Sequence, residues 1–588
     1  MKTANPFNEA ITLASVLLFL LTPSLRAASA VATPVAEPAV TVGDPANPAG
    51  LAKAIQDAYR SGARKIAVSK GVYRLPDAPG DVCKLEKWQD AEISGEGVTL
   101  IAEVPTDHYG RMSGIFEMRQ CKRVTLRGFV MSQSEVSFRQ GKVTVIDSGD
   151  GAPGSWSCVW KPDAGYPELP MPPDMKAIGS WNIVDPATRR LKVKAGDMGG
   201  LTWAPETGGG YRLRGFKAPP NLAVGDWLVT RRDEVNRPYK IRLIECEDCT
   251  VRAVTLSRNW FAPIREDFGS ANRIIACRWE PGPKPPGATE EPLVASSADG
   301  FHSMCARKGP VIEDCVMQGI LLDDCIAING EFSQLVKTDG AALTLVDNKC
   351  GLAPNEPILI SGKTGPHQRA MVKAIGANAD KTVKVTLDRA INPPGEGGIA
   401  WAPWRCGAGY RIAHCKIGNT RSRGILVKAD DGEIRDNVIA DTRMAAVNIG
   451  PESYYKETGY WGRIAIENNT IVNCGGYAYG RAAIWVHGHG SGTIDNGDLV
   501  VRGNRFTANY QGDVEIEGAS NVLVTGNTFT GRTSWPFPMP LPTLARVSNS
   551  QEVRFLANAV SDPAAYATPL VKSGMNVSGI TVDWAKQP

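Results

Sequence analysis

A short sequence unit recurs through the second half of the chain. Each copy has alternating apolar residues, a turn that carries Asn or Cys, and a further apolar residue. Five copies begin at Arg411, Gly432, Ile464, Leu499 and Val522. The turn residues Cys415 and Asn437 are 22 positions apart, and Asn504 and Asn527 are 23 apart. A period of this size, made of short strands, is typical of one coil of a parallel β-helix.

The repeat predicts an all-β, right-handed parallel β-helix solenoid. Asn suits the turn because it tolerates left-handed backbone and can bond its neighbours on adjacent coils. A leucine-rich repeat would need a Leu spacing that is absent, and a β-propeller would repeat every 40 to 50 residues or so. Leu51, Ile55 and Ala58 recur at helical spacing before Gly62. We therefore expect an N-terminal helix over residues 50–61 that caps the open end of the solenoid.

Two stretches interrupt the repeat and predict small inserted β-barrels. The first is rich in Trp, Pro and Gly, and the second reads as short antiparallel strands. Insertions in solenoids emerge from one side and often shape the binding face. The predicted division is a signal peptide (1–30), a linker, cap and first coils (31–136), a first insert (137–235), coils with an acidic site (236–334), a second insert (335–402) and C-terminal coils (403–588).

Composition narrows the class of partner. The chain has 588 residues, with 65 Lys and Arg against 61 Asp and Glu, for a net charge of +4. This balance argues against a nucleic-acid partner. An apolar run at Ile11–Leu21, followed by the small residues Ala28–Ala30, predicts a secretory signal peptide cleaved near Ala30. No later stretch is apolar enough to span a bilayer, so we expect a secreted or periplasmic protein.

The 13 cysteines do not follow a zinc-binding pattern. Cys121, Cys277, Cys315, Cys415 and Cys474 fall at strand-like positions. A buried free Cys behaves as a small apolar residue. We therefore interpret the cysteines mainly as core residues, with one or two disulfides among them.

Three aspartates are the main candidates for chemistry. Asp323 and Asp324 follow Asp299 by about one coil, and equivalent positions on neighbouring coils lie about 4.8 Å apart. The consecutive residues Asp323 and Asp324 can share a face only at a bend. Crowded carboxylates perturb each other's pKa values, and glycoside hydrolysis needs one protonated acid beside one carboxylate. The alternative is a structural turn whose acidic residues face solvent.

Charged and aromatic residues are expected around these aspartates. Aromatic faces stack on sugars, whereas Arg, His and acidic side chains bond hydroxyl groups. Each residue alone is more often structural than functional, but together they predict a sugar subsite. The predicted substrate-binding residues are His302, Arg265, Asn329, Arg423, Glu452, Glu457 and Trp461.

Several of these segments resemble glycoside hydrolase family 110. The motifs are Ala298–His302, Val311–Cys315, Leu322–Gly330, Arg423–Leu426 and the loop from Glu452 to Gly459. The resemblance covers roughly residues 240 to 530. It implies a secreted β-helix enzyme that removes terminal α-1,3-linked galactose with inversion, and it places the catalytic acids on Asp299, Asp323 and Asp324. The chain departs from the family pattern at Asn329, where a His is expected, and this puts the exact sugar in doubt.

The expected function is an exo-acting inverting α-galactosidase with no organic cofactor and no metal. The alternatives are a polygalacturonase-like hydrolase, a polysaccharide lyase, or a carbohydrate-binding solenoid without activity. The expected partner is a terminal galactoside of a glycan or oligosaccharide. The sequence leaves open the linkage, the division of roles among the aspartates, and the oligomeric state, with a dimer among the options.

Overall fold

The computed structural model describes residues 38–588 except for short segments. These are 77–82, 105–113, 148–155, 172, 174–177, 193–197, 216–218, 220, 234–238, 321–322, 363–366, 395–396, 460–461, 477–480, 489–495, 533–539 and 586–588. The chain divides into Met1–Pro38 and Ala39–Pro588, and every element below lies in the second unit. The predicted signal peptide lies outside the described residues.

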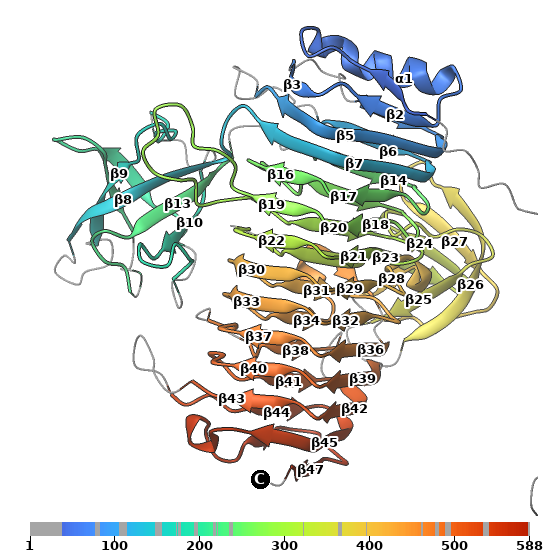
Figure 1. Cartoon of the computed structure of the whole chain (residues 1–588). Helices are drawn as coiled ribbons and strands as arrows, with labels where there is room; N and C mark the ends of the chain where they lie inside the picture. The colour runs from blue at the N-terminus through green and yellow to red at the C-terminus, as the bar shows by residue number, and fades with distance from the viewer. Residues whose placement is uncertain are drawn as a thin grey trace, which may run out of the picture. The chain divides into compact units, whose positions relative to one another are not determined.

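The second unit is a right-handed parallel β-helix, as the repeat predicts (Figure 1). Its coils present three faces of parallel strands. The first face holds β4 (Cys83–Glu86), β6 (Phe116–Arg119), β14 (Ile241–Ile244), β17 (Ile264–Asp267), β20 (Phe301–Met304), β23 (Ile326–Asp339), β31 (Ile425–Val427), β34 (Val447–Ile449), β38 (Ile484–Val486), β41 (Val514–Glu517), β44 (Ala545–Ser548) and β46 (Val571–Ser573).

The other two faces form one continuous sheet, because the long strands β5 (Gln89–Ala102), β7 (Lys122–Gln133) and β45 (Gln551–Val560) run through both. The second face adds β1 (Val40–Val42), β2 (Lys65–Val68), β15 (Thr250–Arg252), β18 (Arg273–Ile275), β21 (Val311–Glu313), β29 (Arg411–Ala413), β32 (Glu433–Arg435), β36 (Gly462–Glu467), β39 (Asn496–Arg502), β42 (Ala519–Thr525) and β47 (Thr581–Trp584). The third adds β3 (Gly71–Leu75), β16 (Thr255–Ser257), β19 (Arg278–Glu280), β22 (Val316–Gln318), β30 (Lys416–Thr420), β33 (Val438–Thr442), β37 (Thr470–Val472), β40 (Arg505–Thr507) and β43 (Thr528–Thr530).

Apolar residues stack on one another along the coils. On the first face Ile264, Phe301, Ile326, Ile425 and Val447 occupy one register position, and all are fully buried. Side chains alternate between the interior and the outside, as the period of a strand requires. The outward positions of the same strands are therefore free to carry polar groups.

An asparagine ladder closes the turn between the second and third faces. Asn437, Asn469, Asn504 and Asn527 each donate from Nδ2 to the Oδ1 atom of the next asparagine over 2.9–3.0 Å, and Asn558 accepts the last of these bonds. This confirms the predicted bonding between coils. The left-handed backbone is not taken by these residues, however, but by the residue before each of them, such as Asp436 (φ 55°) and Asn468 (φ 55°).

Cysteines continue this turn in the preceding coils. Cys277, Cys315 and Cys415 stand where later coils have Asn, and the Cys415 backbone N–H donates to Asn437 Oδ1 over 2.9 Å. All 13 cysteines lie in the described residues, and each is a buried free thiol. The expectation of one or two disulfides is therefore wrong. The thiols lie against backbone carbonyl groups, for example Cys315 Sγ at 3.3 Å from Glu313 O.

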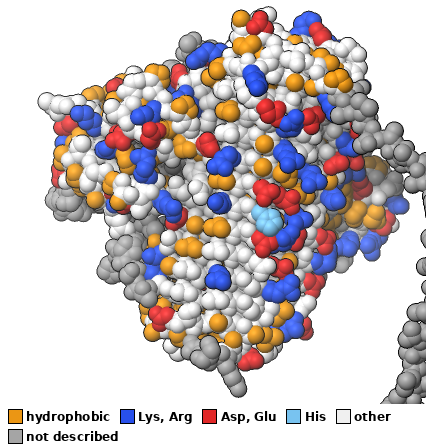
Figure 2. Space-filling model, viewed as in Figure 1, with side chains coloured by type: hydrophobic (Ala, Val, Ile, Leu, Met, Phe, Trp, Pro, Cys, Tyr) orange, Lys and Arg blue, Asp and Glu red, His pale blue; other side chains and the backbone are white. Residues whose placement is uncertain are grey.

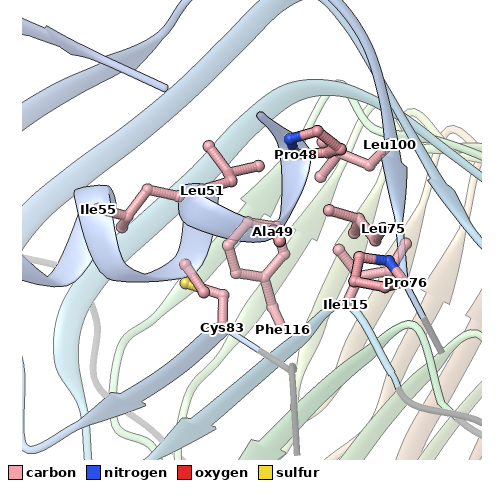
Figure 3. A pocket seen from close by; sticks show the side chains of 11 residues that line it. Pro48, Ala49, Leu51, Ile55, Leu75, Pro76, Cys83, Leu100, Ile115 and Phe116 are labelled. Atoms are coloured by element: carbon pink, nitrogen blue, oxygen red, sulfur yellow. The ribbon is translucent and has the colours of Figure 1, made fainter. Parts of the chain in front are cut away.

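The capping helix α1 (Leu51–Arg60) is present where it was predicted. Its buried residues are Leu51, Ile55 and Ala58. The 3-10 turn η1 (Pro48–Gly50) leads into it. Figure 3 shows the apolar pocket between the helix and the first coils, with Leu75, Leu100 and Phe116 on the opposite side from α1. The helix thus covers apolar core that the first coil would otherwise expose.

The two interruptions of the repeat are antiparallel β structures. The first holds β8 (Phe138–Asp147), β9 (Ser157–Pro162), β10 (Ile178–Val184), β11 (Thr202–Pro205), β12 (Tyr211–Arg214) and β13 (Trp227–Arg232) in one six-stranded sheet. The second holds the end of β23 with β24 (Ala342–Leu345), β25 (Pro357–Ser361), β26 (Gln368–Ala377), β27 (Val383–Leu387) and β28 (Ile399–Trp401), before the 3-10 turn η3 (Pro403–Arg405). Both lie beside the coils in Figure 1.

Candidate active site

Three successive coils bring charged residues together just before the strands of the first face. Asp299, Asp324 and Arg423 precede β20, β23 and β31 at equivalent positions. The Gly300 N–H donates to Asp324 O over 2.9 Å, and the Cys325 N–H donates to Arg423 O over 3.1 Å. Asp323 stands at a bend beside Asp324. Oxygen atoms of Asp299, Asp323 and Asp324 lie within 4.8 Å of one another, and we call these residues the aspartate cluster.

Figure 2 shows acidic, basic and histidine side chains gathered on the surface of the molecule. The sequence placed the three aspartates on one side of the solenoid from their spacing alone. The structure brings them together, and it shows that their environments differ.

Asp324 is a buried carboxylate with a dedicated counter-ion. Arg423 donates to its oxygens from the backbone N, from Nε and from one terminal nitrogen, each over 2.8 Å. Both side chains are buried. Burial by itself lowers the pKa of Arg423, but the Asp324 carboxylate outweighs it and raises that pKa well above its usual value. Asp324 and Arg423 therefore form a buried ion pair in which each side chain is the other's partner.

Asp323 has the opposite environment. It is partly exposed. Desolvation, the Asp299 carboxylate and the Asp324 carboxylate together raise its pKa well above the ordinary value, and Arg423 only partly opposes them. The backbone N–H of Asp324 lies 3.2 Å from Asp323 Oδ1 and 3.2 Å from Asp299 Oδ1, so one donor serves both carboxyl groups. Asp323 is the member of the cluster that holds a proton most readily.

Asp299 is linked to a histidine. Asp299 Oδ2 lies 2.7 Å from His302 Nδ1, and His302 Nε2 lies 2.9 Å from Asn329 Oδ1. The Asn329 Nδ2 group donates to Gly330 O over 3.2 Å, which is consistent with its carbonyl oxygen facing the histidine. Asn329 is fully buried. Asn329 is the position at which the chain departs from the family pattern. It holds His302 through a hydrogen bond from the buried side and does not reach the surface.

A second set of charges lies next to Arg423. Arg423 also donates to Glu452 over 2.6 Å, and Lys428 donates to Glu452 over 3.2 Å and to Glu457 over 2.6 Å. Burial alone would raise the pKa of both glutamates. At Glu452, Arg423 and Lys428 outweigh burial and lower the pKa. At Glu457, Lys428 and His302 have the same effect on the pKa. Both glutamates are thus held ionised.

Lys428 was missed by the sequence analysis, although its side chain is fully buried. A signal was available. Lys428 directly follows the apolar strand β31, one position beyond the pairing of Val427 with Ile328, where the preceding coil has Asn329. A charged residue that ends a buried strand, in register with the candidate site residue Asn329, could have been predicted as a site residue too.

Arg265 lies beside His302 in the strand register, one coil earlier. Its Nε donates to Asp267 Oδ1 over 2.8 Å, so its charge is already partnered. Asp267, two residues on in the same strand, was also missed. Trp461 falls outside the described residues.

The aspartate cluster is also the one group of side chains in the described part of the chain with the close spacing of a metal site. Its donor set fits a cation poorly, because Arg423 bonds both oxygens of Asp324 and His302 bonds Asp299. The Arg423 guanidinium already supplies positive charge at that point. Among the described residues no helix is long and apolar enough to cross a membrane.

Comparisons with known proteins agree with the fold. A family model described as "Right handed beta helix region" matches residues 406–579. Tailspike protein 3 of bacteriophage CBA120 is 9% identical with a TM-score of 0.41, and the match covers 91% of this chain but only 59% of the tailspike. An exopolygalacturonase from Thermotoga maritima is 12% identical with a TM-score of 0.39, over 82% of each chain.

The GH87 α-1,3-glucanase of Streptomyces thermodiastaticus is 11% identical with a TM-score of 0.39, over 94% of this chain and 68% of that catalytic unit. No curated protein sequence matches this chain.

Proposed function

We propose that this protein is a glycoside hydrolase whose catalytic groups are in the aspartate cluster. The observation that carries the proposal is the contrast within the cluster, where Asp323 has a raised pKa while Asp324 is paired with the Arg423 guanidinium. Hydrolysis of a glycosidic bond needs this division between a protonated acid and an ionised carboxylate.

The contrast assigns roles that the sequence left open. Asp323 is the general acid, which protonates the leaving oxygen. Asp299, held by His302 and by the Asp324 N–H, is the carboxylate that activates water or attacks the sugar. The Asp324 carboxylate adds to the effects of burial and of Asp299 that raise the Asp323 pKa, since like charges oppose joint ionisation.

The spacing bears on the stereochemistry. An inverting pair of carboxyl groups is about 6.5–9.5 Å apart and a retaining pair about 5–5.5 Å. The 4.8 Å limit within the aspartate cluster joins one chosen oxygen of each carboxyl group, so it does not separate these two classes, and we propose inversion, as the family resemblance implies. NMR of the first product settles the question, because the anomer released either matches or opposes that of the substrate.

The proposed substrate is a terminal α-linked galactose, with the α-1,3 linkage first. What supports it is the resemblance of Ala298–His302 and Leu322–Gly330 to the galactosidase family. The test is a panel of nitrophenyl α- and β-glycosides and α-1,3-galactosyl oligosaccharides, with identification of the sugar released. Release of another sugar would replace galactose in the proposal and leave the catalytic groups unchanged.

The assignment of Asp323 is tested by Asp323→Asn, which keeps the shape and removes the proton. We expect kcat to fall by about 10²-fold or more. Arg435→Gln, at a half-buried position of β32 on the second face, is the control and should retain activity. Full turnover by Asp323→Asn would reject the role of Asp323. An ultraviolet-absorbing product that disappears with chelator would instead indicate a lyase.

A further inference from the structure

A tight hairpin lies beside the aspartate cluster. Glu452 and Glu457 pair across it, with N–H···O distances of 2.9 Å and 3.2 Å in the two directions. The 3-10 turn η4 (Ser453–Tyr455) forms its tip, and Lys456 follows it in the left-handed region at φ 59°. The hairpin leads into the short strand β35 (Glu457–Thr458).

Ion pairs and strand pairing hold the base of this hairpin. Glu452 accepts from Arg423 and Lys428, and Glu457 accepts from Lys428. β35 pairs antiparallel with β23, Gly330 opposite Thr458. Arg423 also bonds Asp324, so the hairpin is linked to the aspartate cluster through this guanidinium.

The tip presents two aromatic rings to solvent. Tyr454 is 90% exposed and Tyr455 is 64% exposed, and no other aromatic side chain of the described residues is exposed to this degree. The ring centroids are 5.0 Å apart and the rings are nearly perpendicular at 89°. A hairpin anchored by buried ion pairs that exposes two adjacent tyrosines is unusual, because large apolar surface is normally buried unless it binds something.

Tyr455 is the tyrosine whose charge state is influenced by the aspartate cluster. Burial and then the Asp323 carboxyl raise the pKa of Tyr455, with a smaller contribution from Glu452 in the same direction. The Tyr455 phenol is therefore neutral at physiological pH. It can donate one hydrogen bond while its ring offers an apolar face.

We propose that Tyr454 and Tyr455 form the binding platform for the sugar unit next to the cleaved bond. This inference rests on the proposed glycosidase function. The apolar C–H face of a pyranose packs on an aromatic face, and tyrosine gives this contact area at low cost in conformational entropy. The anchored hairpin fixes the platform before the substrate arrives, which removes part of the cost of binding.

The first test compares ring removal with hydroxyl removal. Tyr454→Ala and Tyr455→Ala should each reduce kcat/KM on an α-1,3-galactosyl oligosaccharide about tenfold, mainly through KM. Tyr454→Phe and Tyr455→Phe keep the rings and should stay close to the parent. Met575→Ala removes an equally exposed apolar side chain elsewhere (77% exposed) and should have no effect.

The second test separates binding from catalysis. In the Asp323→Asn background, calorimetry with the same oligosaccharide should show binding that is lost when Tyr454 and Tyr455 are both changed to Ala. If binding survives the double change while turnover depends on Asp323, the platform is rejected and the proposed function stands. If no glycoside is cleaved but the double change still abolishes oligosaccharide binding, the platform stands and the proposed function fails.

Self-association is the remaining explanation for exposed tyrosines. Light scattering of the parent and of the Tyr454→Ala/Tyr455→Ala double variant distinguishes it. A parent dimer that becomes a monomer in the variant, with unchanged oligosaccharide binding, would assign the tyrosines to a contact between two copies and overturn the proposal. An unchanged mass together with lost binding supports it.

Discussion

Asp323 and Asp324 are neighbours in the chain with different environments. Arg423, which is 99 positions after Asp324 in the sequence, bonds one of them and leaves the other with a raised pKa. The sequence predicted that the aspartates would meet, because their spacing is one coil. It could not divide their roles, since that depends on a contact across the second insert.

The raised pKa of Asp323 predicts how stability depends on pH. Between the ordinary Asp value of about 3.9 and the higher folded value, the folded state binds more protons than the unfolded state, so stability falls as pH rises through this window. Asp323→Asn removes that loss. We expect the variant to have a higher Tm than the parent at pH 7 and an equal Tm near pH 3, in thermal unfolding followed by circular dichroism. A variant that is less stable at pH 7 would contradict the assigned pKa direction.

At the scale of elements, the asparagine ladder shows how a turn residue serves several coils. Asn504 donates to Asn527 Oδ1 and to Ile466 O, while its own Oδ1 accepts from the Asn469 side chain and backbone. The turn signal in the sequence identified these residues. The sequence analysis expected the left-handed backbone at the Asn itself, and this is wrong, because the preceding residue takes it whether that residue is Asp436, Gly503 or Ala557.

Removing one rung should destabilise the coils on both sides. Asn504→Ala leaves buried backbone groups without partners, and each such group costs about 1–3 kcal/mol. We expect a loss of that order or more in the free energy of unfolding by urea. Asn392→Ala, at an exposed loop position, is the control and should stay within about 0.5 kcal/mol. Equal effects of the two changes would show that the ladder contributes no special stability.

The cysteines give a second prediction at this scale. Because all 13 are buried free thiols, a thiol reagent should modify almost none in the native protein and 13 after denaturation. Reducing agent should leave the Tm unchanged. Fewer than 13 reactive thiols in denaturant without reductant would indicate a disulfide. Burial raises the pKa of Cys83 and Cys474 to about 12, which further suppresses their reaction.

At the scale of the whole molecule, the repeat was sufficient to predict the solenoid. The helical spacing of Leu51, Ile55 and Ala58 was sufficient to predict its cap. Short strands such as β29 and β32 follow directly from the pattern of Arg411–Ala413 and Glu433–Arg435. The site was predicted in part: the aspartates, His302 and Arg423 lie together, but Lys428 and Asp267 were missed. Lys428 bonds Glu452 and Glu457, and Asp267 bonds Arg265 and Arg242; which of these side chains meet depends on local side-chain geometry that the repeat pattern does not specify.

The predicted export signal belongs to this scale. Protein recovered from an exported fraction should begin near residue 31, because the apolar run Ile11–Leu21 and the small residues Ala28–Ala30 predict cleavage there. N-terminal sequencing or intact mass measures this directly. Recovery of the exported protein with Met1 still attached would refute cleavage.

The strand β23 joins two parts of the molecule that look separate. It begins in the first face between β20 and β31, then pairs with β35, and ends within the second insert beside β28 and β24. Exchange of that insert between genes would have to join two pieces inside a hydrogen-bonded strand, where an error of one residue turns every following side chain to the opposite face. We therefore expect lineages of this protein to vary in the loops at the far end of the insert, while its root is inherited together with the catalytic coils.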